Sequence, residues 1–174
     1  MYFYGGGAYR EANREFQRAL SLDPNMGAAL NMLGYTYSDM GDNERAIKAF
    51  ERYAEVMPED ANPLDSIAEQ YFMMGNLDKA IENFNAALEI QPDFGCEVRL
   101  AYVYALKQDY SETMRLIEGF VEWAATPGYK AETYLWMSLY DIILGKVKKA
   151  FADLDKVDEW ADKVQEAQKK LYKF

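Results

Sequence analysis

Two stretches of this 174-residue chain repeat one pattern. Residues 30–58 read LNMLGYTYSDMGDNERAIKAFERYAEVMP, and residues 64–92 read LDSIAEQYFMMGNLDKAIENFNAALEIQP. Four positions keep a 34-residue interval through three copies: Gly7, Gly41 and Gly75; Ala12, Ala46 and Ala80; Phe16, Phe50 and Phe84; Pro24, Pro58 and Pro92. A fixed period of this length is the sequence signature of a repeat array.

Each conserved position of the repeat has a physical role in a pair of antiparallel helices. The glycine permits a left-handed turn at the end of the first helix, because it has no Cβ. The alanine lets the second helix approach the first closely, and the phenylalanine fills the space between neighbouring units. The proline prevents the second helix from continuing. The pattern therefore predicts an all-α protein.

The first helices of the two quoted copies carry a further motif. They read Leu30-x-x-Leu33-Gly34-x-x-Tyr37 and Leu64-x-x-Ile67-Ala68-x-x-Tyr71. This pattern resembles the tetratricopeptide repeat family. The resemblance implies a right-handed superhelical solenoid of antiparallel helix pairs, which is a non-enzymatic module that binds peptides or proteins.

We expect the chain to form a single domain, residues 1–174, that is made up of repeats and a capping helix. We expect an incomplete repeat 1, mostly a second helix, at 1–24, and full repeats at 25–58 and 59–92. Looser repeats are expected at 93–127 and 128–157, followed by a capping helix at 158–174. Asp141 departs from the pattern, which favours an aromatic residue there.

The expected cap has a single apolar face. Its apolar residues recur at steps of four and three, which is typical of one side of a helix: Trp160, Val164, Ala167, Leu171 and Phe174. A terminal helix of this kind covers the last apolar surface of an array.

The glycine run Gly5-Gly6-Gly7 leaves little room for a first helix in repeat 1. The second helix of that repeat, at about residues 8–22, should then leave Ala12, Phe16 and Ala19 only partly covered. Such an apolar edge either recruits a partner or marks a truncated start. The sequence leaves both alternatives open.

Charge and composition limit the function classes. The net charge is −10, and residues 1–145 carry 11 basic and 23 acidic side chains while residues 146–174 carry 8 and 6. Nucleic-acid binding needs a basic surface, so we expect no nucleic-acid partner. The N-terminal residues carry no secretory signal, and no stretch is long and apolar enough to span a membrane. We therefore expect a cytoplasmic protein.

The residues that most catalytic and metal sites need are scarce. The chain has no histidine and a single cysteine, Cys96, which we interpret as a buried structural thiol. The acidic run Asp153, Asp155 and Asp158 lacks the spacing and the glycine of a calcium loop. We predict no catalytic residue, no metal and no cofactor.

The family resemblance implies that first helices line a concave groove. Candidate partner-binding residues lie on the side of each first helix that faces away from the second: Asn31, Tyr35, Asp39, Asn62, Asp65, Glu69, Phe72, Arg99 and Tyr102. Repeat 5 offers apolar residues at the equivalent positions: Leu135, Leu139, Ile142 and Ile143. These either receive an apolar anchor of a partner or pack against the capping helix.

Some family members grip a carboxyl terminus with a clamp of lysine, asparagine and arginine. The comparable places here hold Asn31, Tyr35, Ser66, Gly95 and Arg99. Only Arg99 is a cation, so we predict no such clamp. The alternative role of Arg99 is an ion pair with Glu69 or Asp65.

Three hypotheses of function follow. The first is a protein-interaction scaffold that binds a peptide or partner protein in the groove. The second is a self-assembling module that forms homo-oligomers through the incomplete first repeat. The third is a positioning module of a larger multidomain protein.

Overall fold

The computed structural model describes residues 6–123 and 126–171, which are α-helical with short turns and, within these ranges, contain no strand. The chain forms two compact units, Met1–Cys96 and Glu97–Phe174. The start of the expected repeat 1 and the end of the expected cap, residues 1–5 and 172–174, lie outside the described residues. The all-α prediction is confirmed.

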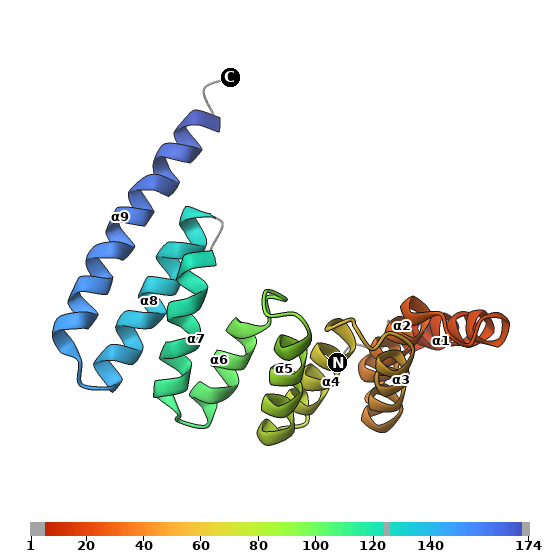
Figure 1. The fold of residues 1–174 in the computed structure, drawn as a ribbon. Helices are drawn as coiled ribbons and strands as arrows, with labels where there is room; N and C mark the ends of the chain where they lie inside the picture. Colours follow the sequence, from red (N-terminus) through yellow and green to blue (C-terminus); the bar gives the residue numbers. More distant parts are fainter. Residues whose placement is uncertain (1–5, 124–125, 172–174) are drawn as a thin grey trace. The chain divides into compact units, whose positions relative to one another are not determined.

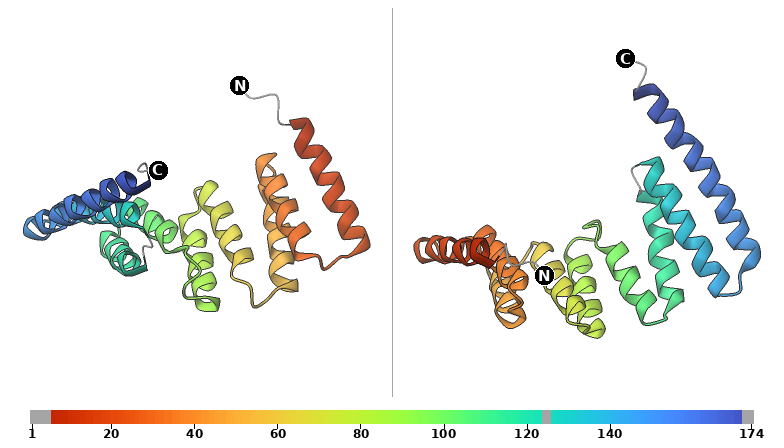
Figure 2. Two further views of the ribbon diagram at one scale, coloured as in Figure 1. Left: turned by 90° about the horizontal axis from the view of Figure 1, so that it is seen from above. Right: turned by 180° about the vertical axis from the view of Figure 1, so that it is seen from behind.

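The N-terminal unit is a series of helices in which each packs on the next along the chain (Figures 1 and 2). The helices are α1 (Gly6–Leu22), α2 (Gly27–Asp39), α3 (Asn43–Val56), α4 (Asn62–Met73) and α5 (Leu77–Ile90). The first and second helices of repeat 2 are thus α2 and α3, and those of repeat 3 are α4 and α5. Repeat 1 contributes α1.

The C-terminal unit contains two antiparallel helix pairs (Figure 1). These are α6 (Glu97–Leu106) with α7 (Tyr110–Trp123), and α8 (Pro127–Ile143) with α9 (Val147–Leu171). The second helix of repeat 5 and the cap were expected to divide at residue 157. The structure instead has one continuous helix, α9, because no residue between 147 and 171 breaks it.

The turns between the paired helices follow the glycine positions of the repeat. Gly41 and Gly75 have φ angles of 77° and 76°, in the left-handed region. The side chains of Asp42 and Asn76 then cap α3 and α5 by accepting hydrogen bonds from backbone N–H groups. Gly7 does not share this role, since it lies in the first turn of α1. The turn that the repeat pattern predicts at Gly7 is therefore wrong.

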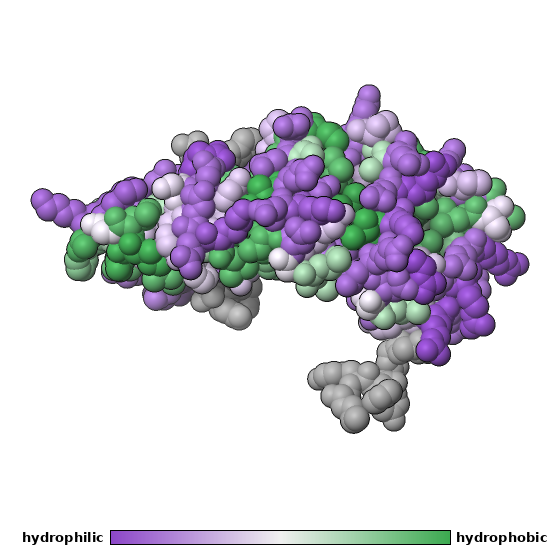
Figure 3. All heavy atoms as spheres, turned by 90° about the horizontal axis from the view of Figure 1, so that it is seen from below, coloured by the Kyte–Doolittle hydropathy of each residue, from purple (hydrophilic) through white to green (hydrophobic). Residues whose placement is uncertain are grey.

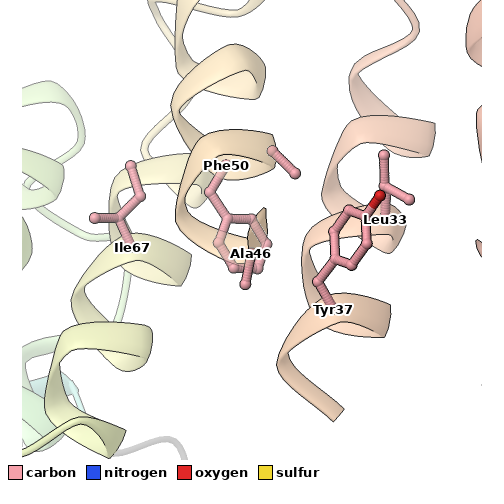
Figure 4. Close-up of a cluster of buried hydrophobic side chains, with 6 residues drawn as sticks. Leu33, Tyr37, Ala46, Phe50 and Ile67 are labelled. Atoms are coloured by element: carbon pink, nitrogen blue, oxygen red, sulfur yellow. The ribbon is translucent and has the colours of Figure 1, made fainter. Parts of the chain in front are cut away.

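The core of the N-terminal unit forms where α3 lies between α2 and α4 (Figure 4). Ala46 and Phe50 of α3 are 0% and 1% exposed, and Leu33 of α2 and Ile67 of α4 pack in the same cluster. A Cβ at Gly34 would lie 2.3 Å from the Phe50 ring, so only glycine fits there without a shift of the ring. The repeat positions thus set how closely the helices approach.

Two further sequence predictions are confirmed in this unit. Cys96 is fully buried, with its thiol 3.8 Å from the carbonyl oxygen of Phe84. Ala12, Phe16 and Ala19 of α1 are only partly covered.

The described helices include none with the length and apolar character that a bilayer crossing requires.

Candidate functional site

The nine candidate residues are divided between the two units. Seven lie on α2 and α4 of the N-terminal unit, and Arg99 and Tyr102 lie on α6 of the C-terminal unit. All nine are on first helices, as predicted. We call the seven residues on α2 and α4 the N-terminal candidate surface.

A chain of polar side chains connects α2 and α4 in the N-terminal candidate surface. The hydroxyl groups of Tyr35 and Ser66 lie 2.9 Å apart, and Ser66 donates a longer hydrogen bond, 3.5 Å, to the Asn31 side-chain oxygen. The Tyr35 ring also meets Phe50 edge-on, with ring centroids 5.1 Å apart. Tyr35 is therefore held at both its ring and its hydroxyl. A rigid aromatic residue presents contact area at a low entropic cost.

The acidic residues of this surface differ in their accessibility. Asp65, Glu69 and Phe72 follow at steps of four and three along one face of α4. Asp65 is only 5% exposed, whereas Glu69 and Phe72 are half-buried. Asp39, at the end of α2, is exposed. Glu69, Phe72 and Asp39 therefore offer a partner more surface than Asp65 does.

Asn62 belongs to a different network, at the start of α4. Its side-chain amide donates to the Tyr53 hydroxyl over 3.4 Å, and its backbone N–H donates to Asp60. The Tyr53 hydroxyl in turn donates to Asp60 over 2.6 Å. Burial, and then the hydrogen bond with Asp60, raise the pKa of Tyr53. This network fixes the loop between α3 and α4.

Sequence reasoning missed Met32, and a second exposed methionine, Met73, lies beside the candidate residues of α4. Met32 of α2 and Met73 of α4 are 48% and 70% exposed. Their helical positions put Met32 beside Tyr35 and Asp39, and Met73 beside Glu69, which was a signal available in the sequence. Methionine side chains adapt to irregular apolar partners. The N-terminal candidate surface therefore includes flexible apolar groups.

The first helices of the C-terminal unit expose a larger apolar area. On α6, Tyr102 is 55% exposed, and Val98 and Leu106 one helical turn to either side are about half-exposed. On α8, the four apolar candidates and Trp136 are also about half-exposed: Leu135, Leu139, Ile142 and Ile143. Figure 3 shows apolar surface among hydrophilic side chains in this unit, on the left of the view.

The exposure of these α8 residues favours one of the two alternatives. About half of the side-chain surface of Leu135, Leu139, Ile142 and Ile143 is not covered by the last helix or by any other described element. The residues of α8 that are buried lie elsewhere on the helix: Thr133, Met137, Ser138 and Asp141. The apolar stripe of α8 is therefore available to a partner.

The interface between α8 and α9 contains a charged cluster. Asp141, where the repeat pattern favours an aromatic residue, is fully buried with its carboxylate 3.3 Å from the Lys149 ammonium. Lys149 also pairs with Glu118 of α7 over 2.5 Å. Burial, and then a hydrogen bond with Asp141, raise the pKa of Asp153 to about 6. Asp141 and Asp153 are buried within the unit, whereas Lys149 and Glu118 are partly exposed, and none of the four belongs to the apolar stripe.

Within residues 6–123 and 126–171, no three histidine, cysteine or carboxylate side chains come together as metal ligands would. The exposed first-helix residues are instead aromatic, apolar and acidic, with Arg99 as an exposed cation. This composition suits recognition of another polypeptide.

Family models match the first half of the chain. Two models, both described as tetratricopeptide repeat, match residues 4–69 and 66–94. Together they cover residues 4–94 of the 174. No curated protein matches the chain.

Several solved structures share the fold. The crystal structure of MamA has a TM-score of 0.78 and 22% sequence identity, over 92% of each chain. A putative kinesin light chain from Podosopora anserina, with nearly identical TPR-like repeats, has a TM-score of 0.70 and 16% identity, over 91% of this chain and 90% of that one. YrrB, described as a TPR protein with an unusual peptide-binding site, has a TM-score of 0.67 and 17% identity, over 88% and 78%. At these identities the likeness concerns the fold.

Proposed function

Because the chain belongs to the tetratricopeptide repeat family, we propose that it is a non-enzymatic scaffold that binds a peptide or partner protein through its first helices. One observation carries this proposal. The first helices α6 and α8 leave Tyr102 and the apolar stripe of α8 about half-exposed, while the conserved apolar positions of the second helices are used in the core. Apolar area of this extent, next to polar groups, is typical of interaction surfaces.

The two units suggest different contributions to binding. In the N-terminal candidate surface, Asn31 and Tyr35 are held in place and suit hydrogen bonds to a peptide backbone. In the C-terminal unit, Tyr102 and the α8 stripe suit an apolar anchor or the apolar face of a partner helix. YrrB is described as having a peptide-binding site, which agrees with this class of ligand.

The test compares the wild-type chain with a variant that carries Tyr102→Ala and Arg99→Glu. Both side chains are exposed, so the variant should keep its fold while losing contacts with a partner. Capture from an extract of the source cell, followed by quantitative mass spectrometry, measures which proteins are retained. We expect at least one protein to be retained by the wild type and lost, by roughly tenfold or more, with the variant.

Arg115→Glu is the matched control, since Arg115 is an exposed arginine on the second helix α7. It makes the same charge change away from the first helices. If the first-helix variant and the wild type retain the same proteins in equal amounts, the proposal is wrong. If the control loses the same partner, net charge rather than this surface governs capture.

A self-assembling module is the second candidate function. It is favoured by the partly covered Phe16 and the exposed Tyr9, which both lie on α1. Light scattering after size exclusion tests it. A monomer at high micromolar concentration excludes self-assembly, whereas a dimer that Phe16→Glu dissociates supports it. A role as positioning module in a longer protein remains a third hypothesis.

A further inference from the structure

The N-terminal unit has an open depression on a face of α4 that the proposed function does not use. Its volume is about 640 Å³, its floor is formed by Leu64, Ile67 and Tyr71 of α4, and its walls come from α3 and α5. We call it the outer groove. A space of this volume falls within the range of small-ligand pockets and accommodates one or two side chains rather than a whole helix.

The outer groove is separate from the N-terminal candidate surface. Its three floor residues recur at steps of three and four and so share one side of α4, whereas Asp65, Glu69 and Phe72 occupy the opposite side. A ligand in the outer groove therefore contacts none of the candidate first-helix residues of α4.

The walls of the outer groove carry an excess of negative charge. Glu51 of α3 and Glu82 of α5 are both exposed, and within the described part of the chain neither forms an ion pair. A third wall residue, Glu55, is already paired with Arg52 over 2.7 Å. The groove therefore places beside an apolar floor two carboxylates that form no ion pair within the described residues, with Lys48 as a nearby cation that interacts with Glu51.

Among the described residues that line the groove, Lys79 is the single cation, and it is held against the floor. Its ammonium lies 4.8 Å from the centre of the Tyr71 ring and donates to the Tyr71 hydroxyl over 3.4 Å. This cation–π contact keeps Lys79 next to α4 rather than next to Glu82. It therefore leaves the Glu82 carboxylate available.

The equivalent position in the preceding repeat lacks the space and the two carboxylates of the outer groove. One repeat earlier, 34 residues back, Gln17 replaces Glu51, Leu20 replaces Ala54 and Lys48 replaces Glu82. Leu20 packs against the core cluster and Gln17 donates to the Tyr37 hydroxyl. The floor positions keep apolar residues in both repeats. The space and the carboxylates of the outer groove therefore come from residues outside the repeat motif.

We propose that the outer groove binds a basic segment of a partner protein. An arginine or lysine of that segment lies with its aliphatic stem on Leu64 and Ile67 and its charged head between Glu51 and Glu82. Long basic side chains commonly cover apolar surface with their stems in this way. Charge-assisted hydrogen bonds to two carboxylates give the head its specificity. The inference does not depend on partner binding by the first helices.

The experiment uses a labelled dodecapeptide in which arginine and leucine alternate, with fluorescence anisotropy as the readout. The control peptide has glutamate in place of arginine. We expect the basic peptide to bind the full chain and the acidic peptide not to bind. The double variant Glu51→Gln with Glu82→Gln should weaken binding roughly tenfold, because two charged partners are lost.

Two further variants separate the groove from general charge attraction. Ala54→Leu places in the groove the side chain that the preceding repeat has there, with no change of charge, and should weaken binding at least about fivefold. The pair Glu15→Gln and Glu59→Gln removes the same charge from exposed positions outside the groove. It should change affinity less than about twofold.

The proposal is wrong if the basic peptide does not bind, or if the Ala54→Leu variant binds it with unchanged affinity. It is also wrong if the Glu15 and Glu59 control pair loses as much affinity as the Glu51 and Glu82 variant. A fourth outcome that overturns it is a self-associated chain that the Glu51 and Glu82 variant dissociates. The last outcome identifies a second copy of this chain as the occupant. If Ala54→Leu does not fold, NMR of the wild type tests the site instead. The backbone amide chemical shifts that change when the basic peptide is added should belong to α3, α4 and α5.

Discussion

The hydroxyl groups of Tyr35 on α2 and Ser66 on α4 lie 2.9 Å apart and join two successive first helices. Ser66 is 1% exposed, so its hydroxyl has little access to water. Tyr35→Phe should therefore cost about 1 kcal/mol of unfolding free energy, because a buried polar group loses a partner. Urea denaturation measures this difference.

The control for this change is Tyr9→Phe, which removes a hydroxyl from an exposed tyrosine on α1. It should leave the stability unchanged within about 0.5 kcal/mol. Equal effects of the two substitutions would show that the bond between α2 and α4 contributes nothing to stability.

A second prediction concerns the close approach of α2 and α3. Gly34→Ala places a Cβ 2.3 Å from the Phe50 ring and should cost about 2 kcal/mol, since the buried ring has to move. Gly119→Ala is the matched change in α7, where a Cβ meets nothing within 4 Å. It should stabilise the chain by up to about 1 kcal/mol. A Gly34→Ala variant as stable as the wild type contradicts the packing described for Phe50.

The sequence predicts this fold well for residues that pack at repeat positions, and less well for residues whose contacts lie outside the repeat pattern. Ala46 and Phe50 act through packing that recurs at Ala80 and Phe84 in the next repeat, so their burial could be read from the period alone. Gly7 keeps the period but lies inside α1, so its place in the period did not predict its conformation. Asp141 breaks the pattern, and its ion pair with Lys149 of α9 could not be inferred from spacing.

The candidate site was less predictable than the fold. Helical position correctly put all nine candidates on first helices, but it did not distinguish the buried Asp65 from the exposed Asp39. It also gave no sign that Asn62 joins Tyr53 and Asp60 in a loop network. These differences arise from contacts between neighbouring helices, which a pattern along one helix does not contain.

A third prediction follows from the turn between α6 and α7. Gln108 has a φ angle of 62°, in the left-handed region that Gly41 and Gly75 occupy in earlier repeats. A side chain in this region costs about 1 kcal/mol relative to glycine. Gln108→Gly should therefore stabilise the C-terminal unit by roughly that amount in thermal or urea unfolding. Gly145→Gln, the reverse change at a φ of 73°, should destabilise it.

The fourth prediction is a pH dependence that arises from Asp153 on α9. Its pKa is raised to about 6 from 3.8, firstly by burial and then by the hydrogen bond with Asp141. The other charged groups near it are Lys149 on α9, which lowers its pKa, and Glu118 on α7, which raises it. The folded state therefore binds a proton more tightly at Asp153 than the unfolded state does.

The direction in which stability changes with pH follows from this difference in proton binding. Between about pH 4 and pH 6 the folded state holds more protons at Asp153, so the stability that it contributes is full below pH 4 and is lost as the pH rises through about 6. The loss is on the order of 2 kcal/mol. The unfolding free energy of Asp153→Asn minus that of the wild type should therefore increase by this amount between pH 4 and pH 7.

Asp155→Asn is the matched control, because it removes a carboxylate from an exposed position two residues along the same helix. Carbon-detected NMR of the side-chain carboxyl groups tests the cause directly, since the Asp153 signal should titrate with a midpoint near 6. A midpoint near 4 would mean that burial between α8 and α9 does not raise this pKa. The pH-dependent difference between Asp153→Asn and the wild type would then have to vanish as well.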